Sequence, residues 1–174
     1  MARGVPVRAR GRNRSRPAPD AAVEIVQGEL LDLPGLITAA DGCDAIVHCA
    51  ALSAPWGTAA DFEDANVNGT ANVIAAARQT SVRRLVHISS PAVIFAGVDQ
   101  RLFGDDAPDP SRHSSRYART KQVADELVRA VSGTIETVIL RPKAIYGAGD
   151  RALVPRRRPQ RVRHSPRRDS RRPT

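Results

Sequence analysis

The chain of 174 residues is long enough for one domain with a hydrophobic core and too short for two ordinary ones. Hydrophobic residues make up 41% of it and aromatic residues only 3%, so we expect a mostly aliphatic core. No apolar run approaches the roughly 20 residues that a membrane-spanning helix needs. The Arg-rich start of the chain has no apolar stretch behind it, so a secretory signal is not expected either.

The net charge of +9 is concentrated at the two ends of the chain. Residues 1–17 contain six Arg and no acidic residue, and residues 151–174 contain ten Arg and one acidic residue. The stretch between them, 18–150, is left with 11 basic and 17 acidic residues, a net charge of −6. A nucleic-acid-binding domain usually carries basic residues on its folded surface. The acidic stretch 18–150 does not fit this pattern, so we expect no specific nucleic-acid partner.

The two cysteines, Cys43 and Cys49, are six residues apart, without a Cys-x-x-Cys pair or paired histidines. This spacing does not fit a metal site, so we expect no metal. Both residues lie beside or within an apolar stretch. We therefore expect buried free thiols in a reducing cytoplasm.

Strands and helices are predicted to alternate along the chain. In chain order they are a weak strand over 5–10, a strand over 23–26, a short helix or turn over 30–40, a strand over 44–51, a helix over 59–79, a strand over 84–90, a helix over about 114–131 and a strand over 135–140. The run 44–51 is continuously apolar, which is typical of a strand buried on both faces of a parallel sheet. This alternation predicts an α/β fold with a parallel, doubly wound sheet.

Three stretches are predicted to be irregular. Residues 13–21 are linker-like, and residues 96–112 form a loop rich in Gly, Asp and Pro. Residues 151–174 contain little apolar surface to offset chain entropy, which predicts a disordered tail. The expected organisation is a basic segment over 1–22, a domain over 23–150 and the tail.

Tyr117 and Lys121 are four residues apart on a predicted helix, so they lie on one face. An ammonium group beside a phenol favours the phenolate and assists proton transfer. The same pair also occurs by chance on amphipathic surface helices.

Ser89 and Ser90 end a predicted strand, where α/β sheets present groups to ligands. A hydroxyl there could bind a substrate carbonyl, or it could simply cap the end of the strand.

Six segments in the right order resemble the extended short-chain dehydrogenases/reductases, in particular the NAD-dependent epimerase/dehydratase and 3β-hydroxysteroid dehydrogenase branch. The resemblance runs from about residue 23 to 155 and implies a partial Rossmann-like fold. Six ordered matches are far more specific than any one of them. The segments are Gly28-Glu29-Leu30, Ile46 to Ala51, Asn66 to Val73, Val86 to Ser90, Leu140-Arg141-Pro142 and Ile145 to Asp150.

The resemblance implies hydride transfer between NAD or NADP and a hydroxyl or carbonyl carbon of a small-molecule substrate. Tyr117 would be the acid/base, and Lys121 would hold the nicotinamide ribose. Ser90 would orient the substrate oxygen, with Ser89 as the alternative. Asn66 would lie near the active centre and support the cofactor or the catalytic network.

The resemblance also implies a set of cofactor-contacting residues. Glu29 and Leu30 would approach the adenine, with Glu29 in place of the family's usual Asp. The small residues after the strand over 44–51 would let the cofactor pass close to the backbone. The cofactor performs the redox chemistry and the protein positions it. The set is Glu29, Leu30, Cys49, Ala50, Ala51, Tyr117, Lys121 and Pro142.

Two departures from the family pattern shape the expected activity. The family begins with a strand and a glycine-rich turn that binds the pyrophosphate, and no Gly-x-x-Gly-x-x-Gly occurs in this sequence. The missing strand would be central, so we expect an open core beside Ile46 and Val47. An Arg-rich tail stands where the substrate-binding domain would follow Pro155. We therefore expect a chain truncated at both ends, by a frameshifted or mis-started reading frame, with weak or no dinucleotide binding.

Three functional interpretations remain open. The first is an oxidoreductase or epimerase for a steroid-like or sugar-nucleotide-like substrate, cytoplasmic, with a homodimer as an open option in the full-length family. The second is a polyanion-binding protein acting through its Arg-rich ends, which bind phosphate non-specifically. The third is an inactive fragment. NAD and NADP are also both open, since Arg10 and Arg12 could meet a 2′-phosphate or form a solvated charge run.

Overall fold

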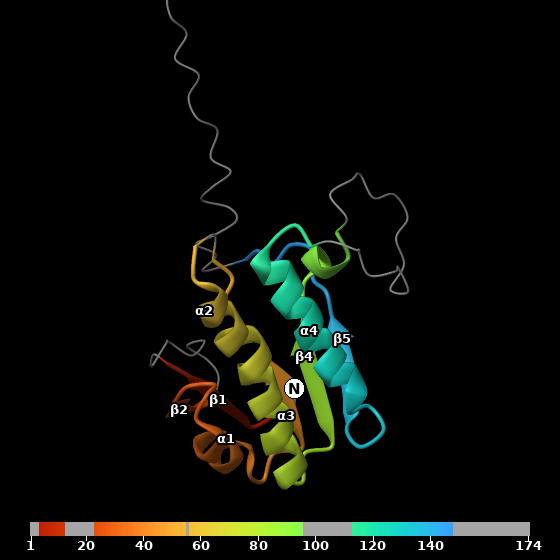
Figure 1. Cartoon of the computed structure of the whole chain (residues 1–174). Helices are drawn as coiled ribbons and strands as arrows, with labels where there is room; N and C mark the ends of the chain where they lie inside the picture. The colour runs from red at the N-terminus through yellow and green to blue at the C-terminus, as the bar shows by residue number, and fades with distance from the viewer. Residues whose placement is uncertain (1–3, 13–22, 55, 96–112, 148–174) are drawn as a thin grey trace, which may run out of the picture. The chain divides into compact units, whose positions relative to one another are not determined.

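The computed structural model describes residues 4–12, 23–54, 56–95 and 113–147 (Figure 1). The predicted linker over 13–21, the loop over 96–112 and the tail over 151–174 lie outside the described residues. The chain divides into two units, Met1–Lys143 and Ala144–Thr174. The elements of the first unit are β1 (Val7–Gly11), β2 (Val23–Gln27), α1 (Leu33–Ala40), β3 (Ala45–His48), α2 (Ala59–Glu63), the π-helix η1 (Asp64–Asn68), α3 (Gly69–Gln79), β4 (Arg84–Ile88), the 3-10 helix η2 (Pro91–Ile94), α4 (Arg116–Ala130) and β5 (Glu136–Leu140).

Every strand pair within the described residues is parallel. β1 pairs with β2, and β3, β4 and β5 form a second sheet in that order. In the second sheet Leu85 of β4 lies opposite Ile46 of β3 on one side and Thr137 of β5 on the other. Parallel neighbours need crossover connections, and helices supply them between β3 and β4 and between β4 and β5. The predicted α/β class is confirmed.

The helices α3 and α4 lie side by side on one face of the sheet formed by β3, β4 and β5 (Figure 1). Successive side chains of a strand point to opposite faces, and Leu85 and His87 of β4 are fully buried on the helix-covered face. The main core cluster is aliphatic, as the composition predicts. Its buried members are Ala40, Val73, Ile74, Ala77, Val82, Leu85, Val128 and Ile135.

The opposite face of this sheet is more open, and the prediction of a strand buried on both faces is wrong for β3. Val47 is 60% exposed, whereas its neighbour Ile46 is partly buried against the core cluster. Among the described residues β3 pairs with β4 on one edge and has no partner on the other. The expected opening of the core is therefore present at Val47 but not at Ile46.

The long helix predicted over 59–79 is three consecutive pieces, because a π-helical turn separates α2 from α3. Its start is a capping box, in which Thr58 and Asp61 each bind the other's backbone N–H. The π-turn contains Asn66, which is 1% exposed. Insertions of this kind in helices often occur at functional sites.

The cysteine prediction holds only in part. Both thiols are free, but Cys49 is exposed and Cys43 is only half-buried. Cys49 follows the last residue of β3 and so lies beyond the part of the strand that the helices cover. In the part of the chain that the structure describes, no helix is long and apolar enough to cross a membrane.

Truncation of Leu85 tests the importance of the core between β4 and the helices. We expect Leu85→Ala to lower the free energy of unfolding by about 2–5 kcal/mol, because it leaves a cavity in a fully buried site. The matched variant Leu31→Ala removes the same atoms from a side chain that is 53% exposed, and should cost less than about 0.5 kcal/mol. Urea unfolding of both variants measures the difference, and equal losses would contradict this description of the core.

Candidate active site

Tyr117, Lys121 and Asp125 follow one another at intervals of four residues along α4. The helix begins where Ser115 accepts a hydrogen bond from the Ala118 N–H, at 3.1 Å. Side chains four residues apart lie above one another on the same face of a helix. Lys121 and Asp125 are buried against the sheet, at 1% and 0% exposure, and Tyr117 near the start of the helix is half-buried.

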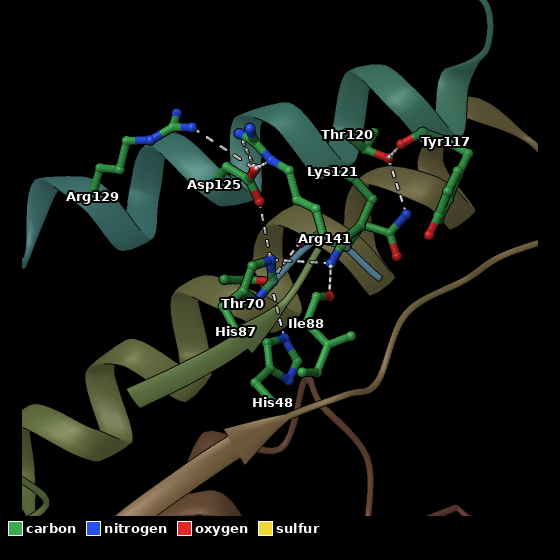
Figure 2. Close-up of polar contacts among 11 residues, drawn as sticks. His48, Thr70, His87, Ile88, Tyr117, Thr120, Lys121, Asp125, Arg129 and Arg141 are labelled. Atoms are coloured by element: carbon green, nitrogen blue, oxygen red, sulfur yellow. Dashed lines mark hydrogen bonds and ion pairs between the residues drawn. The ribbon is translucent and has the colours of Figure 1, made fainter. Parts of the chain in front are cut away.

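The Lys121 ammonium is bound by β4. Its Nζ donates to the Ile88 carbonyl at 2.9 Å and lies 3.0 Å from His87 Nε2. Figure 2 shows the side chain pointing toward these two residues. Burial lowers the pKa of Lys121 from 10.5 to about 8, against the opposing charges of Asp125 and Cys49.

Asp125 is an ionised carboxylate inside the fold. Its Oδ2 accepts from Arg141 Nη2 at 3.0 Å, and its Oδ1 lies 3.5 Å from His87 Nε2. Burial by itself raises the pKa of Asp125, but the neighbouring His87 and Ser89 and the hydrogen bond and charge of Arg141 outweigh burial and lower it. The carboxylate therefore balances the buried positive charge around it.

A second buried histidine lies beside the first. The ring centroids of His48 and His87 are 5.3 Å apart, and His48 Nε2 lies 3.1 Å from the Thr70 hydroxyl. Because Thr70 donates its only hydroxyl proton to the Asn66 carbonyl, it accepts from His48. Burial, with the nearby His87 and Lys121, lowers the pKa of His48 to about 3, so its ring is neutral.

The Asn66 side chain joins the loop after β3 to α4. Its Oδ1 accepts from the Leu52 N–H at 2.7 Å, and its Nδ2 donates to the Leu52 carbonyl at 3.2 Å and to Thr120 Oγ1 at 3.0 Å. Thr120 in turn donates to the Arg116 carbonyl. Asn66 thus uses its whole amide in contacts within the protein, one of them to the residue just before Lys121.

The two serines that follow β4 are in different environments. Ser89 is buried, and its N–H donates to the Leu140 carbonyl at 2.7 Å, which joins the ends of β4 and β5. Ser90 is half-buried and caps the 3-10 helix η2, since its Oγ accepts from the Ala92 N–H at 3.2 Å. Its hydroxyl proton is still available to a ligand.

The expected catalytic residues are therefore brought together only in part. Asn66, Lys121 and the serines converge where α4 meets the carboxyl end of β4. Within the described residues no hydrogen bond joins Lys121 Nζ to the Tyr117 hydroxyl, and Figure 2 shows Lys121 directed toward β4 instead. The predicted spacing on one helix face is correct, but the ammonium is turned inward.

Besides Tyr117 and Lys121 on α4, the expected cofactor residues lie in three places. Cys49, Ala50 and Ala51 are exposed after β3, and Pro142 is half-buried after β5. Glu29 is exposed after β2, while Leu30 is partly buried against the core cluster. In the described part of the chain, no hydrogen bond or ion pair joins this last pair to Tyr117 or Lys121.

Of the two arginines considered for a 2′-phosphate, Arg10 is not part of a solvated charge run. Its side chain is 12% exposed, and its Nη2 donates to Asp32 Oδ2 at 2.6 Å. A Cβ on Gly28 or Gly35 would overlap the Arg10 guanidinium, so both glycines make room for it. Arg12 is exposed.

Sequence reasoning missed three buried polar residues of this region and one half-buried residue that pairs with them. The buried ones are His48, His87 and Asp125, and the half-buried one is Arg141. Asp125 had a detectable signal, because it continues the four-residue spacing of Tyr117 and Lys121 on the helix face. The two histidines gave none, since a histidine within an apolar strand is equally compatible with other environments.

Several similar proteins of known sequence are named as enzymes. The chain is 34% identical over 164 residues to a 2-alkyl-3-oxoalkanoate reductase of Shewanella oneidensis, an alignment that covers 90% of this chain and 42% of the relative. It is 35% identical over 136 residues to the 3beta-hydroxysteroid-dehydrogenase/decarboxylase isoform 2 of Arabidopsis thaliana, covering 76% of this chain and 24% of the relative. The chain thus spans less than half the length of these relatives.

Solved structures agree with the sequence matches. The structure of MoeE5 in complex with UDP-glucose and NAD superposes with a TM-score of 0.69 at 30% identity, covering 85% of this chain and 49% of MoeE5. A mutated uronate dehydrogenase superposes with a TM-score of 0.66, also at 30% identity, covering 78% and 49% of the two chains. The expected Rossmann-like fold is therefore confirmed, and so is the expected resemblance.

The family profile decides the classification. It matches residues 10–165, which is most of the sequence and includes every strand of the sheet formed by β3, β4 and β5. The chain belongs to the 3-beta hydroxysteroid dehydrogenase/isomerase family, within the extended short-chain dehydrogenases/reductases.

Proposed function

We propose that this chain carries part of the active site of an NAD(P)-dependent oxidoreductase. The reaction is hydride transfer at a secondary hydroxyl or carbonyl carbon of a steroid-like or sugar-nucleotide-like substrate. Relatives are named for reactions of this kind, on 2-alkyl-3-oxoalkanoates and on 3beta-hydroxysteroids, and MoeE5 was crystallised with UDP-glucose and NAD.

The observation that carries this proposal is the meeting of α4 with the carboxyl end of β4. Ser90 at the end of the strand has a free hydroxyl proton, and Tyr117 is partly accessible near the start of the helix. In this proposal Ser90 orients the substrate oxygen and Tyr117 donates or accepts its proton. Ligands of open α/β sheets bind at the carboxyl ends of the strands.

A dinucleotide fits these residues in part. Cys49, Ala50 and Ala51 are small and exposed, so a ligand can approach the backbone after β3. A bound nicotinamide would supply the hydride chemistry. Lys121 does not fit, since its ammonium is buried and bound by His87 and the Ile88 carbonyl. In the described conformation two of the three N–H donors of Lys121 are directed at these groups, and the side chain is buried.

Nuclear magnetic resonance titration of the ¹⁵N-labelled chain with NAD and NADP tests the proposal. We expect binding weaker than micromolar, because the sequence has no Gly-x-x-Gly-x-x-Gly turn for the pyrophosphate. The amide shifts that change should belong to residues 49–51 and 89–90. Ala50→Trp should abolish them by filling the approach, and the matched variant Ala130→Trp, at an exposed helix end, should not.

The same titration distinguishes the polyanion-binding alternative. Phosphate binding by Arg-rich ends would shift only residues near the termini, would accept inorganic polyphosphate equally well, and would disappear at moderate salt. That pattern, or shifts that survive Ala50→Trp, would contradict a dinucleotide site. Micromolar affinity of the chain for NAD or NADP would contradict the importance assigned to the glycine-rich turn for dinucleotide binding.

Asn66 is proposed as a positioning residue for α4. Asn66→Ala should lower the free energy of unfolding by about 1–3 kcal/mol, because both backbone polar groups of Leu52 lose a buried partner. Hydrogen exchange of the Leu52 amide should also accelerate. Asn68→Ala is the control, since exposed Asn68 bonds only Asp64 within the same helix and should cost less than about 0.5 kcal/mol. An unchanged Leu52 exchange rate in Asn66→Ala would refute this role.

The burial of Lys121 predicts a pH dependence of stability. Between the folded pKa of about 8 and the ordinary value of 10.5, the unfolded chain binds a proton that the folded chain has lost, so stability rises with pH. The unfolding free energy of the unsubstituted chain, minus that of Lys121→Met, should rise by on the order of 1–2 kcal/mol from about pH 7.5 to 9.5. Lys143→Met, at an exposed lysine, should leave the profile unchanged. A flat difference for Lys121→Met would show that the ammonium is solvated.

A further inference from the structure

The buried side of α4 contains a cation whose direct partners both belong to one strand. Lys121 is 1% exposed, and its Nζ contacts His87 Nε2 at 3.0 Å and the Ile88 carbonyl at 2.9 Å. Asp125, the nearest carboxylate on the same helix, is occupied by Arg141 at 3.0 Å. The ammonium is therefore held by the hydrogen bonds that it donates to β4 rather than by an ion pair.

We infer that His87 is a positioning residue for Lys121: together with the Ile88 carbonyl it holds the ammonium between β4 and α4, and release of this bond frees Lys121 to turn toward Tyr117 or a bound ligand. The part that concerns the ligand rests on the proposed function. The part that concerns the hold on Lys121 depends only on the geometry of this chain.

The contacts of Lys121 and His87 determine which nitrogen atoms of the two side chains carry protons. Lys121 is charged at neutral pH, and an ammonium has donors but no acceptor. His87 Nε2 must therefore be the unprotonated nitrogen, and the neutral ring carries its proton on Nδ1. Asp125 Oδ1, at 3.5 Å from the same nitrogen, is too far for a hydrogen bond that would favour the other tautomer.

The surrounding groups do not offer Lys121 a competing partner. From β3, the His48 ring faces His87 with a neutral imidazole, and Cys49 just after β3 has only an electrostatic effect on the Lys121 pKa, which it raises. From the segment after β5, Arg141 pairs with Asp125, and Arg129 of α4 reaches that carboxylate only at 4.0 Å. Replacing His87 by a residue without an acceptor therefore leaves the ammonium with one partner in a buried place.

Amine acetylation of the whole chain at pH 7.5 tests the hold on Lys121. The chain has two lysines, so exposed Lys143 is an internal reference in every sample. Peptide mass spectrometry should show Lys121 reacting at least about tenfold more slowly than Lys143, because reaction needs local opening. His87→Met, which removes the acceptor, should reduce that ratio by about tenfold. His87→Gln, which restores an acceptor of similar reach, should keep it within about threefold of the unsubstituted chain.

Equal labelling ratios in the two variants, whether both protected or both reactive, would overturn the role of His87. Should neither variant fold, the imidazole ¹⁵N resonances of the unsubstituted chain decide. A neutral ring protonated on Nδ1 is expected, and protonation of Nε2 at neutral pH would overturn the inference. Neither measurement uses a dinucleotide, so failure of this inference and failure of the proposed function are separate results.

Discussion

The buried carboxylate of Asp125 links the three elements that meet at the candidate site. It lies on α4, pairs with Arg141 after β5, and faces His87 of β4. Loss of one partner from a buried ion pair typically costs about 3–5 kcal/mol, because the remaining charge is left without compensation. The position of α4 over the sheet therefore depends on this contact. The same charge partly opposes the effect of burial on Lys121, four residues earlier on the helix.

A second polar contact, at the other end of the site, joins the loop after β3 to α4. Asn66 lies in a π-helical turn, and its side-chain amide forms hydrogen bonds with the Leu52 backbone and with Thr120. Buried polar networks of this kind rigidify a fold when every member is satisfied. The loop with small, exposed residues and the helix with Tyr117 and Lys121 are thus held as one unit, which is what preorganisation of a ligand site requires.

The sequence predicted the elements well where local periodicity decided them. The strand over 84–90 and the helix over about 114–131 are present as β4 and α4, with ends shifted by a few residues. The spacing of Tyr117 and Lys121 on one helix face was also predictable, because it follows from 3.6 residues per turn. The exposure of Val47 and Cys49 was not, because it depends on which strands and helices cover β3.

The amino-acid sequence by itself determined the alternation of strands and helices, the concentration of positive charge at the ends, and the family, because each of these is written in local patterns and ordered motifs. The tertiary structure alone decided what the site residues contact. Lys121 turns toward His87, 34 positions away, and Asn66 binds Thr120, 54 positions away. Contacts over such distances arise only when helices pack on a sheet, and the direction of a long side chain is set by the acceptors that packing brings within reach.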